Sequence, residues 1–112
     1  MNASTITTLE DAIKAGEAWR RFLDNPGDIV IGATQGAGCF GAAYEYLFNV
    51  SYQLRKAGLH KKVKLTYLTA EPFLGHFGIG GLPHGDTLLG LFLKKEGIGH
   101  HLNKSIATIE DG

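Results

Sequence analysis

The segment that most constrains the fold is "DIVIGATQGAGCFGAAYEYLF", residues 28–48. It opens with a short, continuous apolar run of the kind that forms a buried parallel strand. Glycines then crowd the chain, and a long stretch with the apolar spacing of a helix follows. A buried strand, a glycine-rich turn and a helix in this order predict the first part of a strand–helix–strand unit.

The rest of the chain continues this alternation. A capping box from Thr7 to Glu10 predicts the start of an N-terminal helix, and Asn25-Pro26-Gly27 predicts its end. Glycines at 58 and 97 each follow a pair of basic residues, as at helix ends closed by a left-handed glycine. The expected helices span 7–24, 38–57 and 86–96, and the expected strands span 28–33, 62–69 and 104–110.

This order predicts an α/β fold, a Rossmann-like three-layer domain with a parallel sheet and helices on both faces. We expect residues 1–27 to form an amphipathic helix and lead-in, and residues 28–112 to form the nucleotide-binding-type domain, the two together making one domain. Three strands would leave both sheet edges open, and the sequence closes on the turn signal Asp111-Gly112. We therefore expect an excised fragment of a longer chain. The alternative is a small complete α/β protein that dimerises through a sheet edge.

Composition narrows the class of partner. Eleven basic and eleven acidic residues give zero net charge, so the sequence has no electrostatic footprint for nucleic acid. It contains no apolar run long enough to span a membrane, and we expect the fragment to be soluble. A single cysteine excludes an internal disulfide. Assembly into a homo-oligomer is compatible with all of these features.

The glycines at Gly36, Gly38 and Gly41 match the letters of the G-x-G-x-x-G dinucleotide fingerprint between a strand and a helix. The spacing is imperfect. In the fingerprint the first glycine comes directly after the apolar strand, and here that position is Gly32; counting from there puts a threonine and an alanine where the second and third glycines belong. Glu71 follows the next strand and could bind a ribose hydroxyl, although it lies farther along than the roughly 20 residues expected. The pattern leaves open a dinucleotide site or a tight strand-to-helix turn.

Three other residues are candidates for chemistry. Cys39 stands at the start of a predicted helix, where free N–H groups favour a thiolate, although buried free cysteines are commonly apolar fillers. Glu45 lies among apolar and aromatic residues, which suits either a proton-transferring carboxylate or an ordinary solvated helix face. His76 lies in a loop rich in large apolar side chains, which suggests burial against a partner surface. The other histidines have no ligand spacing with Cys39, so we predict no zinc site.

Taken together, two blocks carry a family resemblance. "DIVIGATQGAGCFGAAYEYLFNV" followed by "LTYLTAEPFLGHFGIGGLPHG" resembles the central domain of sulfide:quinone oxidoreductases, members of the flavin-dependent pyridine nucleotide-disulfide oxidoreductase superfamily. The similarity covers roughly residues 9 to 112, and the two glycine-rich blocks together are far more specific than G-x-G-x-x-G alone.

The resemblance implies a function for these residues. Cys39 corresponds to a redox-active cysteine that takes up sulfide sulfur beside FAD, and Glu45 and His76 correspond to residues implicated in proton handling. Electrons would pass from sulfide through FAD to quinone. The FAD would be bound mainly by a flavin domain absent from this chain, with residues 73–83 packed against it. The fragment alone would be inactive, and the whole enzyme would be peripheral on a prokaryotic cytoplasmic membrane. The alternative is an NAD(P)H-binding domain of a related flavoprotein reductase.

Overall fold

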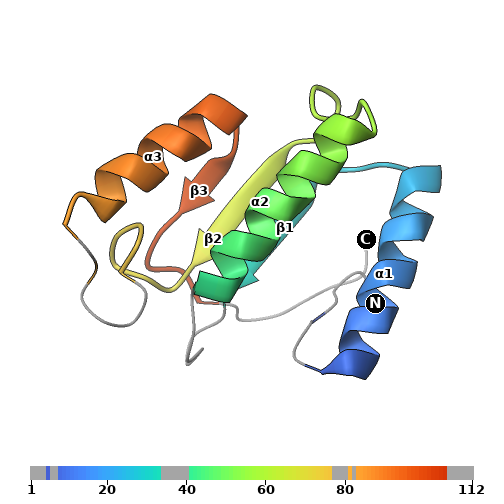
Figure 1. The fold of residues 1–112 in the computed structure, drawn as a ribbon, viewed down its shortest axis with the longest axis horizontal. Helices are drawn as coiled ribbons and strands as arrows, with labels where there is room; N and C mark the ends of the chain where they lie inside the picture. Colours follow the sequence, from blue (N-terminus) through green and yellow to red (C-terminus); the bar gives the residue numbers. More distant parts are fainter. Residues whose placement is uncertain (1–4, 6–7, 34–40, 77–80, 82, 106–112) are drawn as a thin grey trace. The chain divides into compact units, whose positions relative to one another are not determined.

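The computed structural model describes residues 5, 8–33, 41–76, 81 and 83–105, shown in colour in Figure 1. Two compact units are present: α1 belongs to one, and the described residues from 28 to 105 form the other. The elements are, in chain order, α1 (Leu9–Asp24), β1 (Ile29–Ala33), α2 (Gly41–Lys56), β2 (Leu65–Thr69), α3 (Gly85–Glu96) and β3 (Gly99–His101).

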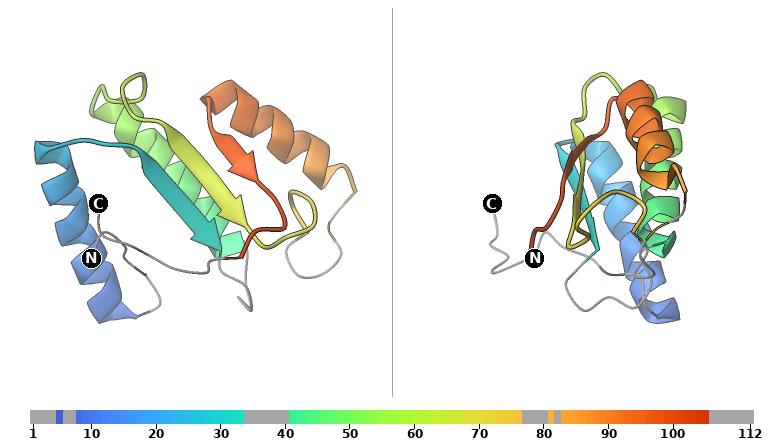
Figure 2. Two further views of the ribbon diagram at one scale, coloured as in Figure 1. Left: turned by 180° about the vertical axis from the view of Figure 1, so that it is seen from behind. Right: turned by 90° about the vertical axis from the view of Figure 1, so that its left-hand side faces the viewer.

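The three strands found in the described residues form one parallel sheet in the order β1-β2-β3. The α/β class and the parallel sheet are therefore confirmed. Strand β1 pairs with β2 from Ile29 opposite Leu65 to Ala33 opposite Thr69. Helices α2 and α3 lie together on one face of this sheet (Figure 2), because the strand order runs in a single direction across it. These two helices thus form one layer. Neither of them lies on the opposite face of the sheet, where a second helical layer is expected from the sequence.

The core lies between this face of the sheet and the two helices. Alternate strand residues point into it, since successive side chains of a strand point to opposite faces. Helix α2 contributes positions three or four residues apart, which lie on one side of a helix. The buried apolar side chains of β1, β2 and α2 are Ile31, Ala33, Leu65, Tyr67, Tyr44, Leu47, Val50 and Leu54.

The N-terminal helix confirms the predicted end and corrects the predicted start. The residue that caps α1 is Thr8, whose Oγ1 accepts a hydrogen bond of 3.0 Å from the N–H of Asp11. The cap is thus one residue beyond the predicted Thr7, which lies outside the described residues. At the other end, the N–H of Asn25 bonds to the carbonyl of Phe22, and the helix stops as the sequence predicts.

The third strand of the described residues is one that the sequence prediction misses. We expect it at 104–110, but β3 is formed by Gly99–His101. Gly97 closes α3 in the left-handed conformation, with φ of 73°, and turns the chain directly against β2. All three residues of β3 are exposed, so they carry no apolar alternation that sequence inspection could detect. Lys104 and Ser105 lie outside any strand, and 106–110 are not among the described residues.

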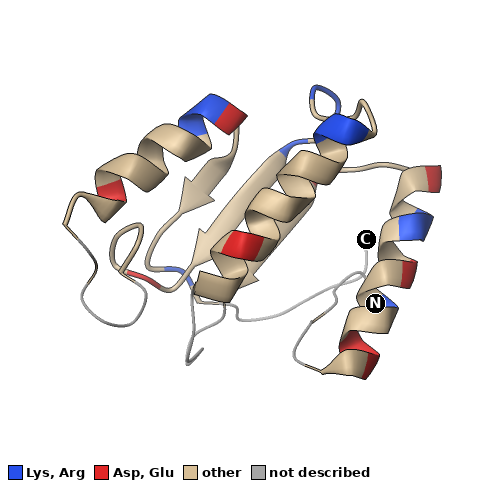
Figure 3. Ribbon diagram, in the orientation of Figure 1, with Lys and Arg blue, Asp and Glu red and all other residues tan. Residues whose placement is uncertain are grey.

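Charged side chains hold the two sheet-covering helices together at their carboxyl-terminal ends. Basic residues gather there in both helices (Figure 3), where they oppose the partial negative charge of the helix end. Arg55 Nη2 of α2 donates to Glu96 Oε2 of α3 at 2.6 Å, and Ser51 Oγ donates to the same oxygen at 3.3 Å. None of the helices in the described part of the chain is both long and apolar enough to cross a membrane.

Candidate functional site at the carboxyl edge of the sheet

Two of the candidate residues, Glu71 and His76, follow the point where the parallel strand β2 ends. Ala33, the last residue of β1, is paired with Thr69, the last residue of β2. The segment that follows β2, residues 70–76, leaves the sheet at this edge. Ligands of open parallel sheets bind at this carboxyl edge, because the loops that follow the strands converge there.

A buried carboxylate forms the centre of this edge. Glu71 is 1% exposed, and its Oε1 accepts three hydrogen bonds from hydroxyl groups. The donors are Tyr44 at 2.8 Å, Thr69 Oγ1 at 3.0 Å and Tyr67 at 3.4 Å. Burial of a carboxylate is costly unless hydrogen bonds replace its water, and these hydroxyls supply that replacement. We call these four residues the Glu71 network.

Both tyrosines of the Glu71 network remain donors over the physiological pH range. Burial raises the pKa of Tyr67 to about 12, and the nearby Glu71 carboxylate adds to this increase. Burial also raises the pKa of Tyr44 far above the ordinary value of a phenol. Loss of either proton would place a second negative charge beside a buried carboxylate, so the neutral hydroxyls are strongly favoured.

Backbone groups connect the Glu71 network to the surrounding loops. The N–H of Gly75 donates to the hydroxyl of Tyr44 at 3.0 Å. From the segment after β3, the N–H of Asn103 donates to the carbonyl of Glu71 at 2.9 Å, and the N–H of Lys104 donates to the carbonyl of Thr69 at 3.0 Å. The network thus ties together the start of α2, the end of β2, the following loop and the segment after β3.

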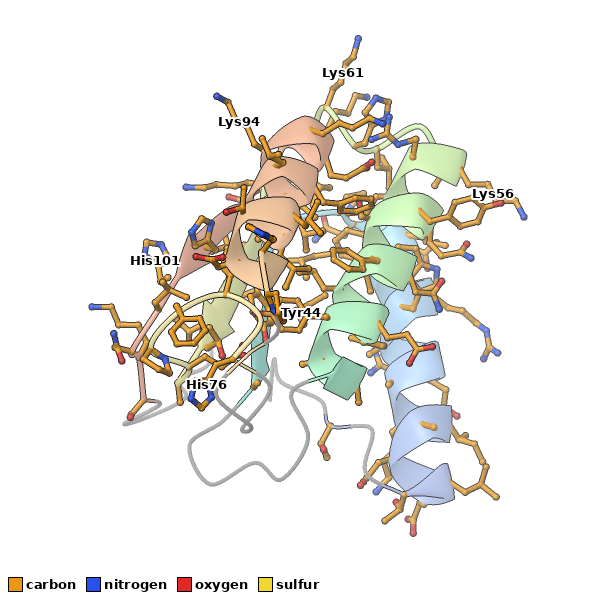
Figure 4. All side chains as sticks on the ribbon, turned by 60° about the vertical axis from the view of Figure 1, so that its left-hand side comes forward. Tyr44, Lys56, Lys61, His76, Lys94 and His101 are labelled. Carbon is orange, nitrogen blue, oxygen red and sulfur yellow. The ribbon has the colours of Figure 1, made fainter. Side chains whose placement is uncertain are left out.

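His76 lies in the loop that Gly75 anchors, toward the same end of the sheet as Tyr44 (Figure 4). It is half-buried, and its ring contacts that of Phe73 edge-on, with 5.1 Å between centroids. Its carbonyl accepts a hydrogen bond of 2.9 Å from the N–H of Gly81. Gly81 has φ of 89°, and a Cβ there would lie 2.8 Å from the Phe73 ring, so this turn requires glycine.

The remaining predicted site residues are only partly within the described chain. Glu45 is exposed on α2, one residue after Tyr44. Gly32 lies within β1, and Gly41 is the first residue of α2. The three other candidates lie outside the described residues; they are Gly36, Gly38 and Cys39.

Sequence inspection singles out Glu71 but misses its three hydroxyl partners. Tyr44 and Tyr67 look like ordinary core aromatics at helical and strand spacing, and Thr69 like the end of a strand. A detectable signal was the choice of tyrosine over phenylalanine at core positions, because a buried phenol needs a hydrogen-bond partner. No cluster of three or more histidine, cysteine, aspartate or glutamate side chains suited to a metal ion occurs among the described residues.

Comparison with known proteins shows that this chain is similar to part of a longer one. No family model matches it. The sulfide-quinone reductase of Aquifex aeolicus (strain VF5) is 38% identical over 109 residues, which is 97% of this chain and 25% of that protein. The X-ray structure of the sulfide:quinone oxidoreductase from the same hyperthermophilic bacterium matches with a TM-score of 0.94, again over 97% of this chain and 25% of the other. The chain thus spans about a quarter of the length of these relatives, and the resemblance found in the sequence is confirmed.

Proposed function

Since its sequence and its fold both match one quarter of a sulfide:quinone oxidoreductase, we propose that this chain is part of a flavin-dependent enzyme that oxidises sulfide and reduces quinone. The observation that carries the proposal is the agreement of 38% identity with a TM-score of 0.94 over 97% of the chain. Oxidation of sulfide to polysulfide sulfur releases two electrons for each sulfur atom. Reduction of a quinone to a quinol takes up two electrons and two protons.

Cys39 is the proposed sulfur carrier. In the sequence, Cys39 comes six residues after the end of β1 and two before the start of α2. Helix α2 carries Tyr44 of the Glu71 network, and β1 pairs with β2, which carries Tyr67 and Thr69. A cysteine beside a helix N-terminus is favoured as thiolate by the free N–H groups there. Bonding of this thiolate to hydrosulfide yields a persulfide, one proton and two electrons.

FAD, when bound, supplies the acceptor for those two electrons, but the described residues do not fit a flavin site of their own. Glu71, the acidic side chain that a nucleotide ribose would need, is 1% exposed and already accepts three hydroxyl hydrogen bonds through one oxygen. We therefore propose that FAD is held mainly by polypeptide outside this chain. The same burial disfavours the NAD(P)H-binding alternative, which relies on Glu71 for the ribose.

The proton released with the persulfide needs an acceptor. We assign this role to Glu45 and His76, one exposed and the other half-buried, on the two segments that Tyr44 links. An exposed carboxylate can exchange protons with solvent, whereas a half-buried imidazole can pass them between solvent and the interior. The whole enzyme is expected to associate with a membrane, and this association would bring the enzyme close to its quinone substrate.

The test is Cys39→Ser in the complete polypeptide that contains this chain, assayed by sulfide-dependent reduction of a short-chain quinone. We expect a loss of roughly 100-fold or more, because serine does not form a persulfide. Flavin content and the circular dichroism spectrum serve as controls for folding. Retained activity would remove Cys39 from the mechanism, and quinone reduction driven by NADH instead of sulfide would favour the alternative.

A further inference from the structure

We propose that Tyr44, held by the buried Glu71, is a positioning residue that fixes the His76 loop against the start of α2. This inference rests on the proposed function, since it assigns a purpose to the placement of His76. None of the proposed chemical steps uses Tyr44 or Glu71. Both are nevertheless buried at the carboxyl edge of the sheet.

Contacts of the Tyr44 hydroxyl join two different residues of the segment after β2 to α2. This hydroxyl donates to Glu71 Oε1 at 2.8 Å and accepts from the N–H of Gly75 at 3.0 Å. Gly75 immediately precedes His76, so this second bond fixes the backbone at the point where the imidazole branches off. The same hydroxyl therefore connects a residue of α2, five positions after Cys39, to the residue before His76.

The path of the loop at Gly75 is closely defined. The backbone φ of Gly75 is 77°, a value that residues other than glycine rarely adopt. A Cβ at this position would lie 3.0 Å from Leu89 Cδ1 and 3.4 Å from the carbonyl carbon of Gly85. The backbone therefore passes close to the start of α3 on one side, and the Tyr44 hydroxyl binds it on the other. A loop confined on two sides holds its next side chain in a narrow range of positions.

Glu71 is itself firmly placed, which makes it a suitable anchor. Its own N–H donates to Thr69 Oγ1 at 3.2 Å, that hydroxyl donates back to Oε1, and the N–H of Asn103 binds its carbonyl. Side chain and backbone are thus both constrained by the ends of β2 and β3. The raised pKa of Tyr44 keeps its hydroxyl protonated, so the link to Glu71 persists over the physiological pH range.

Tyr44→Phe removes this link with little other change. The ring contacts of Tyr44 with Tyr67, at 4.8 Å between centroids, and with Phe48, at 6.4 Å, do not involve the hydroxyl and are retained. The substitution removes a donor to the Glu71 carboxylate and the acceptor for the N–H of Gly75. The matched control is Tyr52→Phe, which removes a hydroxyl from a 59% exposed tyrosine of the same helix.

The experiment is a double-mutant cycle of Tyr44→Phe and His76→Ala in the complete flavoprotein, measured by sulfide-dependent quinone reduction. We expect Tyr44→Phe alone to lower kcat by about 10- to 100-fold, with KM for quinone changed by less than about 2-fold, because small displacements of a reacting group have effects of this size. In the His76→Ala background the same change should cost less than about 2-fold. Tyr52→Phe should match the wild type.

Independent effects of the two substitutions, or an unchanged kcat in Tyr44→Phe, would overturn the inference. Amide hydrogen exchange at Gly75 tests the loop-positioning inference separately from the proposed function, because it does not depend on enzyme activity. Faster exchange in Tyr44→Phe supports loop positioning, and unchanged exchange refutes it. Absence of sulfide-dependent activity in the wild type would instead refute the proposed function. Should Tyr44→Phe not fold, Glu71→Gln weakens the same link, and we expect a smaller loss of kcat in the same direction.

Discussion

Removal of the Glu71 carboxylate should have a large effect on stability. Glu71→Ala removes the acceptor of three hydroxyl groups, which belong to Tyr44, Tyr67 and Thr69. Each of these three donor residues is at most 3% exposed, so water does not readily replace the carboxylate. An unsatisfied buried polar group costs about 1–3 kcal/mol. Because the three donors share one oxygen and can partly rearrange, their costs do not add fully. We expect a total loss of roughly 3–5 kcal/mol in the free energy of unfolding.

Glu71→Gln separates the charge from the hydrogen bonds. The amide oxygen can still accept from the hydroxyls, but hydrogen bonds to a neutral acceptor are weaker by roughly half. We expect this variant to lose only about 1–2 kcal/mol. Glu45→Ala is the control for stability, since it removes an exposed carboxylate from the same region and should change the free energy of unfolding by less than about 0.5 kcal/mol.

The assay is equilibrium urea unfolding at pH 7, followed by circular dichroism at 222 nm. The midpoint and the slope are both fitted, so that a change in stability is distinguished from a change in the denatured state. A cost below about 1 kcal/mol for Glu71→Ala would mean that water readily replaces the carboxylate. A glutamine variant no more stable than the alanine variant would show that charge, and not hydrogen bonding, dominates.

Two further predictions concern pH and backbone conformation. Because the pKa of Tyr67 is raised from 10.0 to about 12, the folded chain keeps a proton that the unfolded chain releases in this window. Stability should therefore fall as pH rises from 10 to 12, by about 1.4 kcal/mol per pH unit from this group, and Tyr67→Phe should flatten the slope in urea titrations. Gly81→Ala should lower the free energy of unfolding by about 1–3 kcal/mol, because φ is 89° and the Phe73 ring is in the way. Gly16→Ala, in a helix and with nothing within 4 Å of the new Cβ, should raise it by about 0.5–1 kcal/mol, as thermal unfolding would show.

Much of the fold follows from local signals in the sequence. The apolar run at 28–33 and the alternation around Tyr67 locate β1 and β2, because burial selects such patterns. The glycine after α2 closes that helix as predicted, with φ of 73° and a bond from the N–H of Leu59 to the carbonyl of Leu54. Strand β3 escapes prediction because it is short, polar and exposed, and only pairing with β2 makes it a strand.

The candidate site is less accessible to sequence reasoning, because its defining contacts are distant along the chain. Tyr44 and Glu71 are separated by 27 residues, and Tyr44 and Gly75 by 31. No local pattern announces that a helix tyrosine will meet a carboxylate after the second strand; their meeting depends on the pairing of β1 with β2. The expectation that Glu71 could bind a ribose hydroxyl rests only on its position after β2 in the sequence. That position does not reveal that the side chain of Glu71 is buried.

The order of the strands also bears on how this polypeptide acquires its structure during synthesis. Neighbours in the sheet are neighbours in the sequence, so β1, α2 and β2 can associate before α3 and β3 have left the ribosome. Because Asn103 and Lys104 are synthesised after β2, their bonds to the end of β2 can form only once that strand is already present. A nascent chain released before residue 103 would possess most of its core yet leave the Glu71 backbone open at the edge where chemistry is proposed. Completion of that edge is therefore a late event in biogenesis, after the sheet that supports it.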